Sequence, residues 1–136
     1  MKTVKVIVID DEFGIREGIR RVLSVSNISL SDSKEDFNFE LSLFETGEEG
    51  VDAIKNGNFD ICFLDNKLPG ISGTEVLEII ATECVNKPLT IMITAFPSVE
   101  TADAAMRNGA FGFLGKPFRP DELKEVTKSA VLKMIS

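Results

Sequence analysis

The stretch Val6-Ile7-Val8-Ile9-Asp10-Asp11-Glu12 joins a short, continuously apolar run to three consecutive acidic residues. An apolar run of this kind is typical of a parallel strand that helices cover on both faces. Two further runs of the same type occur at residues 61–64 and 91–93. The pattern therefore predicts a parallel sheet whose central strands are buried.

Helical patterns separate these runs. Apolar residues recur at the spacing of one helix face, first between residues 15 and 23. We predict further strands at 39–44 and 112–115, and further helices at 47–56 and 99–108. Together these segments predict an α/β fold, in which a five-stranded, doubly wound parallel sheet forms the middle layer of a three-layer sandwich.

With 136 residues, the chain has the size of one ordinary domain, so we predict a single domain over residues 1–136. Its first connection, at about residues 26–38, is rich in Ser, Asp and Asn, a composition typical of an exposed, elongated loop. This composition is compatible with a tolerated surface insertion and with a loop that docks a partner.

The charge of the chain limits its partners. Fifteen basic and 22 acidic side chains give a net charge of −7, which repels nucleic acid backbones and anionic membranes. We therefore expect no direct binding of nucleic acid and no membrane association. No apolar run approaches the length of a spanning helix, and the two cysteines lack metal-ligand spacing. These features predict a cytoplasmic protein with reduced thiols.

Histidine, tryptophan and tyrosine are absent from the sequence. Their absence excludes Ser-His-Asp and Cys-His nucleophile pairs, histidine-ligated metals and a phosphohistidine on this chain. Any chemistry must therefore use carboxylates, hydroxyls and lysines.

Candidate reactive groups follow four of the five predicted strands. Asp10 and Asp11 follow the first strand, Asp65 ends the third, Thr94 ends the fourth, and Lys116 follows the fifth. Because open parallel sheets place their ligand sites beyond the carboxyl ends of the strands, we expect these side chains to share one edge.

Crowded carboxylates raise one another's pKa unless a positive charge joins them, and Mg²⁺ prefers such oxygen ligands. A phosphoryl group at Asp65 would meet this metal, the Lys116 ammonium and the Thr94 hydroxyl, which would neutralise its oxygens. The Asp65 carboxylate would be the nucleophile.

Each of these residues has a structural alternative when taken alone. Asp10 or Asp11 could cap the first helix, and Asp65 could be a turn residue. Thr94 could bond locally within its strand, and Lys116 could belong to a solvated turn. The conjunction of all of them in this order, each at a strand end, favours the chemical interpretation.

The sequence resembles the receiver domain of two-component response regulators (CheY-like) over nearly its whole length. The matching segments are Val8-Ile9-Asp10-Asp11-Glu12, Phe63-Leu64-Asp65, Leu68-Pro69-Gly70-Ile71-Ser72-Gly73, Ile93-Thr94-Ala95 and Gly115-Lys116-Pro117-Phe118. The resemblance implies a flavodoxin-like sheet with strand order 2-1-3-4-5. It also implies phosphorylation on Asp65, which would make the chain a signalling switch that catalyses its own modification rather than a classical enzyme.

The resemblance further implies a magnesium site. Asp11 and Asp65 would bind Mg²⁺ directly, Asp10 would act mainly through metal-bound water, and the main-chain carbonyl of Lys67 would be a further ligand.

In the same family, Thr94 and Lys116 would contact the phosphoryl group, and the Lys116-Pro117 peptide is often cis. Phe113 stands at the family's switch position, where an aromatic ring turns inward as the threonine moves toward the phosphate. A permanently buried core ring at Phe113 is the alternative.

The implied partners are a sensor histidine kinase or phosphotransfer protein, which supplies the phosphoryl group, and an output domain or effector protein. Homodimerisation would use the face of the fourth helix, fifth strand and fifth helix. Residues 94–102 further resemble receivers attached to enhancer-binding transcription activators, which suggests control of transcription.

Two residues depart from the family pattern. Lys67 lies two residues after Asp65, and Phe96 lies two residues after Thr94. Both side chains could hinder the attack of water on an acyl phosphate, so we predict a comparatively long-lived phosphorylated state.

Two alternative functions share some of these residues. A phosphohydrolase of the haloacid dehalogenase type usually needs a second Asp two residues after the nucleophile, where this chain has Lys67. A receiver-like interaction module that works without phosphorylation would not need the set of Asp10, Asp11, Asp65, Thr94 and Lys116.

Overall fold

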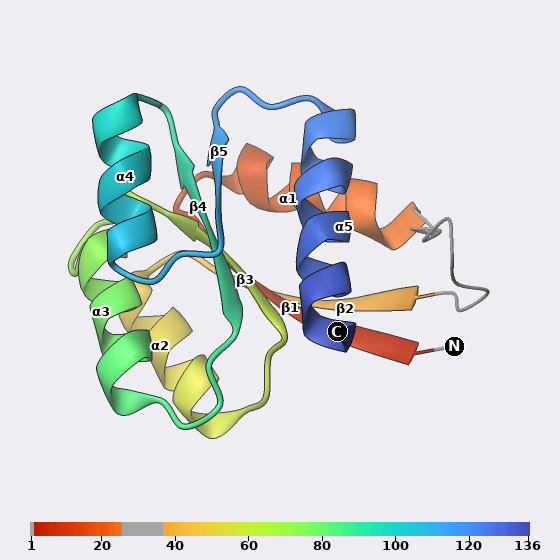
Figure 1. The fold of residues 1–136 in the computed structure, drawn as a ribbon, viewed down its shortest axis with the longest axis horizontal. Helices are drawn as coiled ribbons and strands as arrows, with labels where there is room; N and C mark the ends of the chain where they lie inside the picture. The colour runs from red at the N-terminus through yellow and green to blue at the C-terminus, as the bar shows by residue number, and fades with distance from the viewer. Residues whose placement is uncertain (1, 26–36) are drawn as a thin grey trace.

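The structure, a computed structural model, describes residues 2–25 and 37–136 (Figure 1). The strands are β1 (Lys2–Ile9), β2 (Phe37–Phe44), β3 (Ile61–Asp65), β4 (Leu89–Thr94) and β5 (Gly112–Gly115). The helices are α1 (Phe13–Val25), α2 (Gly47–Asn56), α3 (Gly73–Glu83), α4 (Val99–Arg107) and α5 (Pro120–Ile135). Strands and helices alternate along the chain, as the sequence predicts.

All five strands are parallel and lie in the order β2-β1-β3-β4-β5. Helices α1 and α5 cover one face of this sheet, and α2, α3 and α4 cover the other (Figure 1). The predicted α/β sandwich and its strand order are therefore confirmed.

Alternating residues of β1 supply both apolar cores. Val6 and Val8 pack with the α1 and α5 side, whereas Ile7 and Ile9 pack with the α2, α3 and α4 side. None of the four side chains is exposed to solvent. Burial on both faces explains why the run at the start of the chain is apolar without interruption.

Strand β2 begins two residues earlier than predicted. Phe37 is buried and pairs with Lys2, so residues 37 and 38 belong to the strand and not to the predicted connection. The polar side chain of Asn38 points to solvent, as alternate residues of an edge strand do, and this explains the error. The rest of the predicted loop, residues 26–36, lies outside the described residues.

The start of α3 lies directly against the end of β3. Ser72 caps this helix, and its hydroxyl accepts a hydrogen bond from the Glu75 amide at 3.1 Å. At Gly73, a Cβ atom would overlap the main-chain oxygen of Asp65. The absence of a side chain at Gly73 therefore lets α3 begin beside the strand end that carries Asp65.

Cys62 and Cys84 are both buried and unpaired. Among the described residues, no helix combines the length and the apolar character needed to cross a membrane.

Candidate functional site

The carboxyl ends of the strands surround a hollow of about 250 Å³. Its walls contain five of the predicted site residues, namely Asp11, Asp65, Lys67, Thr94 and Lys116, together with Glu12, Ala95 and Phe96. Parallel pairing of the strands brings these distant parts of the chain to one edge of the sheet. The predicted clustering at this edge is therefore observed.

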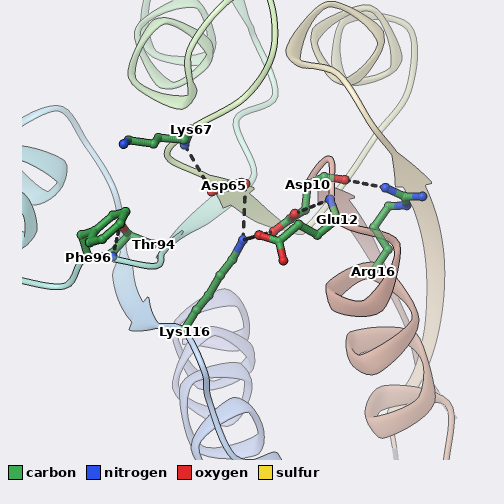
Figure 2. Close-up of polar contacts among 8 residues, drawn as sticks. All are labelled: Asp10, Glu12, Arg16, Asp65, Lys67, Thr94, Phe96 and Lys116. Atoms are coloured by element: carbon green, nitrogen blue, oxygen red, sulfur yellow. Dashed lines mark hydrogen bonds and ion pairs between the residues drawn. The ribbon is translucent and has the colours of Figure 1, made fainter.

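Lys116 is the common cation of the site (Figure 2). Its Nζ lies 2.9 Å from Asp10 Oδ2, 3.0 Å from Glu12 Oε1 and 3.4 Å from Asp65 Oδ2. The side chain of Lys116 is only 8% exposed. Burial opposes its charge, but the ion pairs with Asp10 and Glu12 outweigh this effect and raise the pKa of Lys116. Lys116 therefore remains an ammonium ion at neutral pH.

Asp10 lies beneath the hollow and is completely buried. Its amide donates to the Phe44 carbonyl at 3.0 Å, and its Oδ1 accepts from the Glu12 amide at 2.8 Å. Burial raises the pKa of Asp10. The partners of its main chain and side chain hold Asp10 in place between β1 and the start of α1.

Asp65 is the last residue of β3, a central strand of the sheet, and its side chain lines the hollow. Burial, reinforced by the nearby Asp10 charge, raises the pKa of Asp65 to about 6, although Lys116 acts in the opposite direction. Its Oδ1 accepts a hydrogen bond from the Lys67 amide at 3.2 Å. At pH 7 most of the Asp65 side chain is a carboxylate and can act as a nucleophile.

The acidic residues of the site fit a divalent cation. Asp10, Asp11, Glu12 and Asp65 each offer one carboxylate oxygen, and these four atoms lie within 4.8 Å of one another. Hard oxygen ligands of this kind suit Mg²⁺, which usually keeps several waters beside one or two carboxylates.

Thr94 forms the wall of the hollow at the end of β4. It is 4% exposed, and its hydroxyl oxygen accepts a hydrogen bond from the Phe96 amide at 3.2 Å. Lys67 and Phe96 contact each other beside it, with Lys67 Nζ 5.0 Å from the centre of the Phe96 ring (Figure 2). These two residues, predicted separately to hinder water, form one cation–π pair in the wall of the hollow.

Phe113 does not reach this hollow. Its half-buried ring lines a separate cavity of about 150 Å³ between α3 and α4, with Asn66, Leu77, Met92 and Thr101 among its neighbours. The Lys116-Pro117 peptide after β5 is cis, as the resemblance implied.

Two residues that are not among the predicted site residues contact them. Glu12 forms an ion pair with Lys116, and its position after two aspartates was the available signal. Arg16 is buried, and its Nη1 donates to the Asp10 carbonyl at 2.8 Å (Figure 2). Arg16 lies three residues before Ile19, so its place on the apolar face of α1 could have indicated a buried charge.

Comparison with known proteins gives one consistent result. The family model described as "Response regulator receiver domain" matches residues 6–128. Regulatory protein LuxO from Vibrio vulnificus is 33% identical over 94 residues, which cover 69% of this chain and 20% of LuxO. Response regulator protein PilR from Pseudomonas aeruginosa is 32% identical over 131 residues, which cover 96% of this chain and 27% of PilR. The chain thus spans less than a third of either relative.

A solved structure shares the fold. The crystal structure of a response regulator receiver domain protein (CheY-like) from Methanospirillum hungatei JF-1 matches with a TM-score of 0.81 and 26% sequence identity. The match covers 98% of this chain and 97% of that one.

Proposed function

This chain belongs to the response regulator receiver domain family, and from this premise we propose that Asp65 accepts a phosphoryl group and thereby switches the domain between two conformations. The observation that carries the proposal is the common hollow in which carboxylates, a buried ammonium and a threonine hydroxyl surround Asp65. Receiver domains are signalling domains rather than classical enzymes, and we propose that this one promotes its own modification.

The proposed reaction is a transfer between two side chains. The bond between phosphorus and an imidazole nitrogen breaks, its electron pair stays on the nitrogen, and an Asp65 carboxylate oxygen forms the new bond to phosphorus. Because this chain has no histidine, the donor belongs to a partner, which we propose is a sensor histidine kinase or phosphotransfer protein. Attack of water on the acyl phosphate later releases inorganic phosphate and restores the carboxylate.

Asp11 and Asp65 would hold Mg²⁺ directly, Asp10 would act mainly through water, and the Lys67 carbonyl would be a further ligand. When bound, the ion neutralises charge on the transferring phosphoryl oxygens. Lys116 supplies a second positive charge and is held at the cluster by its contacts with Asp10 and Asp65. The Thr94 hydroxyl oxygen accepts from the Phe96 amide, which leaves its proton available, and it would donate this proton to the phosphoryl group.

Phe113 is the proposed switch residue. Its ring is half-buried and borders the cavity between α3 and α4, so there is space beside it for a different ring position. Movement of Thr94 toward a phosphate would be coupled to this change, which would alter the face of α4, β5 and α5. Val99 and Met106 on α4 are 78% and 50% exposed and supply apolar contact surface there.

This face is the proposed contact for an output domain, an effector protein or a second copy of the chain. Similarity to the DNA-binding transcriptional regulator NtrC from Klebsiella pneumoniae favours control of transcription as the output. We propose that the domain works in the cytoplasm and does not itself bind nucleic acid or membranes, in line with its net charge of −7.

The decisive experiment measures intact mass after incubation with acetyl phosphate, with and without Mg²⁺. We expect a gain of one phosphoryl group that requires Mg²⁺ and is lost in Asp65→Asn. Asp103→Asn is the matched control, because Asp103 is an exposed carboxylate on α4, outside the hollow. If wild type gains no phosphoryl group and also fails to bind beryllofluoride, the chain is an interaction module that works without phosphorylation.

A further inference from the structure

Arg16 carries a charge in a place where charges are rarely found. It lies in the first turns of α1 and is only 8% exposed. Burial of an ion is costly unless hydrogen bonds and opposite charge compensate for it. The contacts of Arg16 therefore indicate what this buried cation does.

The guanidinium of Arg16 joins two loops at the edge of the sheet. Its Nη1 donates to the Asp10 carbonyl at 2.8 Å (Figure 2). Its Nη2 lies 3.5 Å from Glu45 Oε1, in the loop after β2. The ring of Phe13 covers the group, with its centre 5.7 Å from the guanidinium carbon. A fork of donors can make both polar contacts at once, which a single ammonium group cannot do in the same geometry.

The carbonyl that Arg16 binds belongs to the peptide unit between Asp10 and Asp11. Because a peptide unit is planar, fixing its oxygen also fixes the direction in which the chain enters Asp11. The other restraints nearby act on Asp10, through its own amide and its Oδ1. Among the described contacts of this loop, the Arg16 hydrogen bond is the one that orients the Asp10–Asp11 peptide plane.

We propose that Arg16 is a positioning residue for magnesium binding, which aims the Asp11 carboxylate by holding the Asp10–Asp11 peptide plane against Glu45. The inference rests on the proposed function, since it concerns the same Mg²⁺ site. Arg16 touches neither the hollow nor the carboxylates of Asp10, Asp11 and Asp65. Its effect on the metal must therefore pass through the main chain.

The direction in which Mg²⁺ affinity changes when Arg16 is replaced distinguishes this positioning role from the alternatives. If Arg16 acted on the metal only through its charge, its removal would take a cation away from the acidic cluster and tighten Mg²⁺ binding. Loss of orientation weakens binding instead, and loss of a partner that orients a ligand typically costs about 10- to 100-fold in metal affinity. If Arg16 only stabilised the fold, its removal would lower stability and leave the affinity unchanged.

The test compares Arg16→Met with Arg21→Met, which removes the same charge from an exposed position of the same helix. Mg²⁺ is titrated into each protein by calorimetry and by following ¹H–¹⁵N amide shifts, which also report whether the fold is intact. We expect the Mg²⁺ dissociation constant of Arg16→Met to rise about tenfold, and that of Arg21→Met to stay within about twofold of wild type.

Arg16→Lys keeps the positive charge and tests whether the branched guanidinium group is needed. Arg21→Lys is its control. We expect Arg16→Lys to weaken Mg²⁺ binding about threefold, less than Arg16→Met does. If Arg16→Met does not fold, the comparison of Arg16→Lys with Arg21→Lys decides alone. Equal affinities of Arg16→Lys and Arg21→Lys, or tighter binding by Arg16→Met, would overturn the inference. Failure of wild type to bind Mg²⁺ would instead refute the proposed metal site itself.

Discussion

Replacement of Asp65 by Asn should stabilise the metal-free protein at pH 7, although Asp65 is the proposed phosphoryl acceptor. The Asp65 side chain is only 6% exposed and lies beside the buried Asp10. Burial and the charge of Asp10 disfavour its ionised form, whereas Asn has a similar size and no charge. Lys116 would still keep its contacts with Asp10 and Glu12 in the variant.

The size of the gain follows from the raised pKa. The pKa of Asp65 is about 6, well above its ordinary value of 3.8. At 1.36 kcal/mol per unit, ionisation of Asp65 costs the folded state about 3 kcal/mol at neutral pH. This cost already includes the attraction of Lys116. Because Asn fits the hydrogen bonds of the site less well than a neutral Asp does, we expect a net gain of about 1–2 kcal/mol in the free energy of unfolding.

The pH dependence supplies a second check. Between the ordinary pKa of Asp65 and its raised value, the folded state binds more protons than the unfolded state, so stability falls as the pH rises. The penalty is complete above about pH 6 and is roughly half as large at pH 5. The advantage of Asp65→Asn should therefore fall by roughly 1.5 kcal/mol from pH 7 to pH 5, which removes most or all of it.

Urea denaturation followed by far-ultraviolet circular dichroism measures this difference, since the chain has no Trp or Tyr for fluorescence. EDTA keeps the protein free of metal, and Asp103→Asn corrects for the change in net charge. The reasoning would be refuted if Asp65→Asn were no more stable than Asp103→Asn at pH 7. Added Mg²⁺ should stabilise wild type and have little effect on Asp65→Asn.

Three further predictions test other parts of the structure. Gly73→Ala should lower the free energy of unfolding by more than about 2 kcal/mol, because the new Cβ would overlap the main-chain oxygen at the end of β3. Gly18→Ala is the control, because Gly18 lies on α1 with open space around it, and this change should raise the free energy of unfolding by about 0.5–1 kcal/mol. Both values come from urea denaturation, and equal effects would contradict the packing argument. Lys67→Ala and Phe96→Ala should each shorten the lifetime of the phosphorylated state, measured as release of inorganic phosphate, because each breaks the pair in the wall of the hollow; unchanged lifetimes would show that the pair does not exclude water. Cys62, completely buried and with a pKa raised to about 12, should react with a disulfide reagent only at the rate of global unfolding, and fast labelling under native conditions would contradict its burial.

The sequence was a good guide wherever a side chain's place depends on the strand that carries it. Asp65, Thr94 and Lys116 share one edge because parallel strands end on the same side of the sheet, and apolar runs locate those ends. The start of β2 was less predictable, because an edge strand exposes alternate residues and Asn38 resembles loop sequence.

Contacts between side chains of different loops could not be predicted in the same way. The Glu12 ion pair with Lys116 joins residues 104 positions apart and depends on how two long side chains turn. The pairing of Lys67 with Phe96 has the same origin, since sequence spacing placed both at the edge but gave no orientation. The separation of the Phe113 ring from the hollow likewise depends on the direction in which one residue of β5 faces.

The distribution of the site along the chain has a consequence for protein synthesis. Asp10 directly follows β1 and Asp65 ends β3, whereas their shared ammonium follows β5. Ribosomes deliver these strands in that order, so a growing chain can pair β1 with β3 before Lys116 exists to neutralise them. We expect repulsion between the unmatched carboxylates to slow consolidation of the sheet edge until the last strand arrives. An incomplete nascent chain that lacks Lys116 should therefore be a poor phosphoryl acceptor at the proposed site.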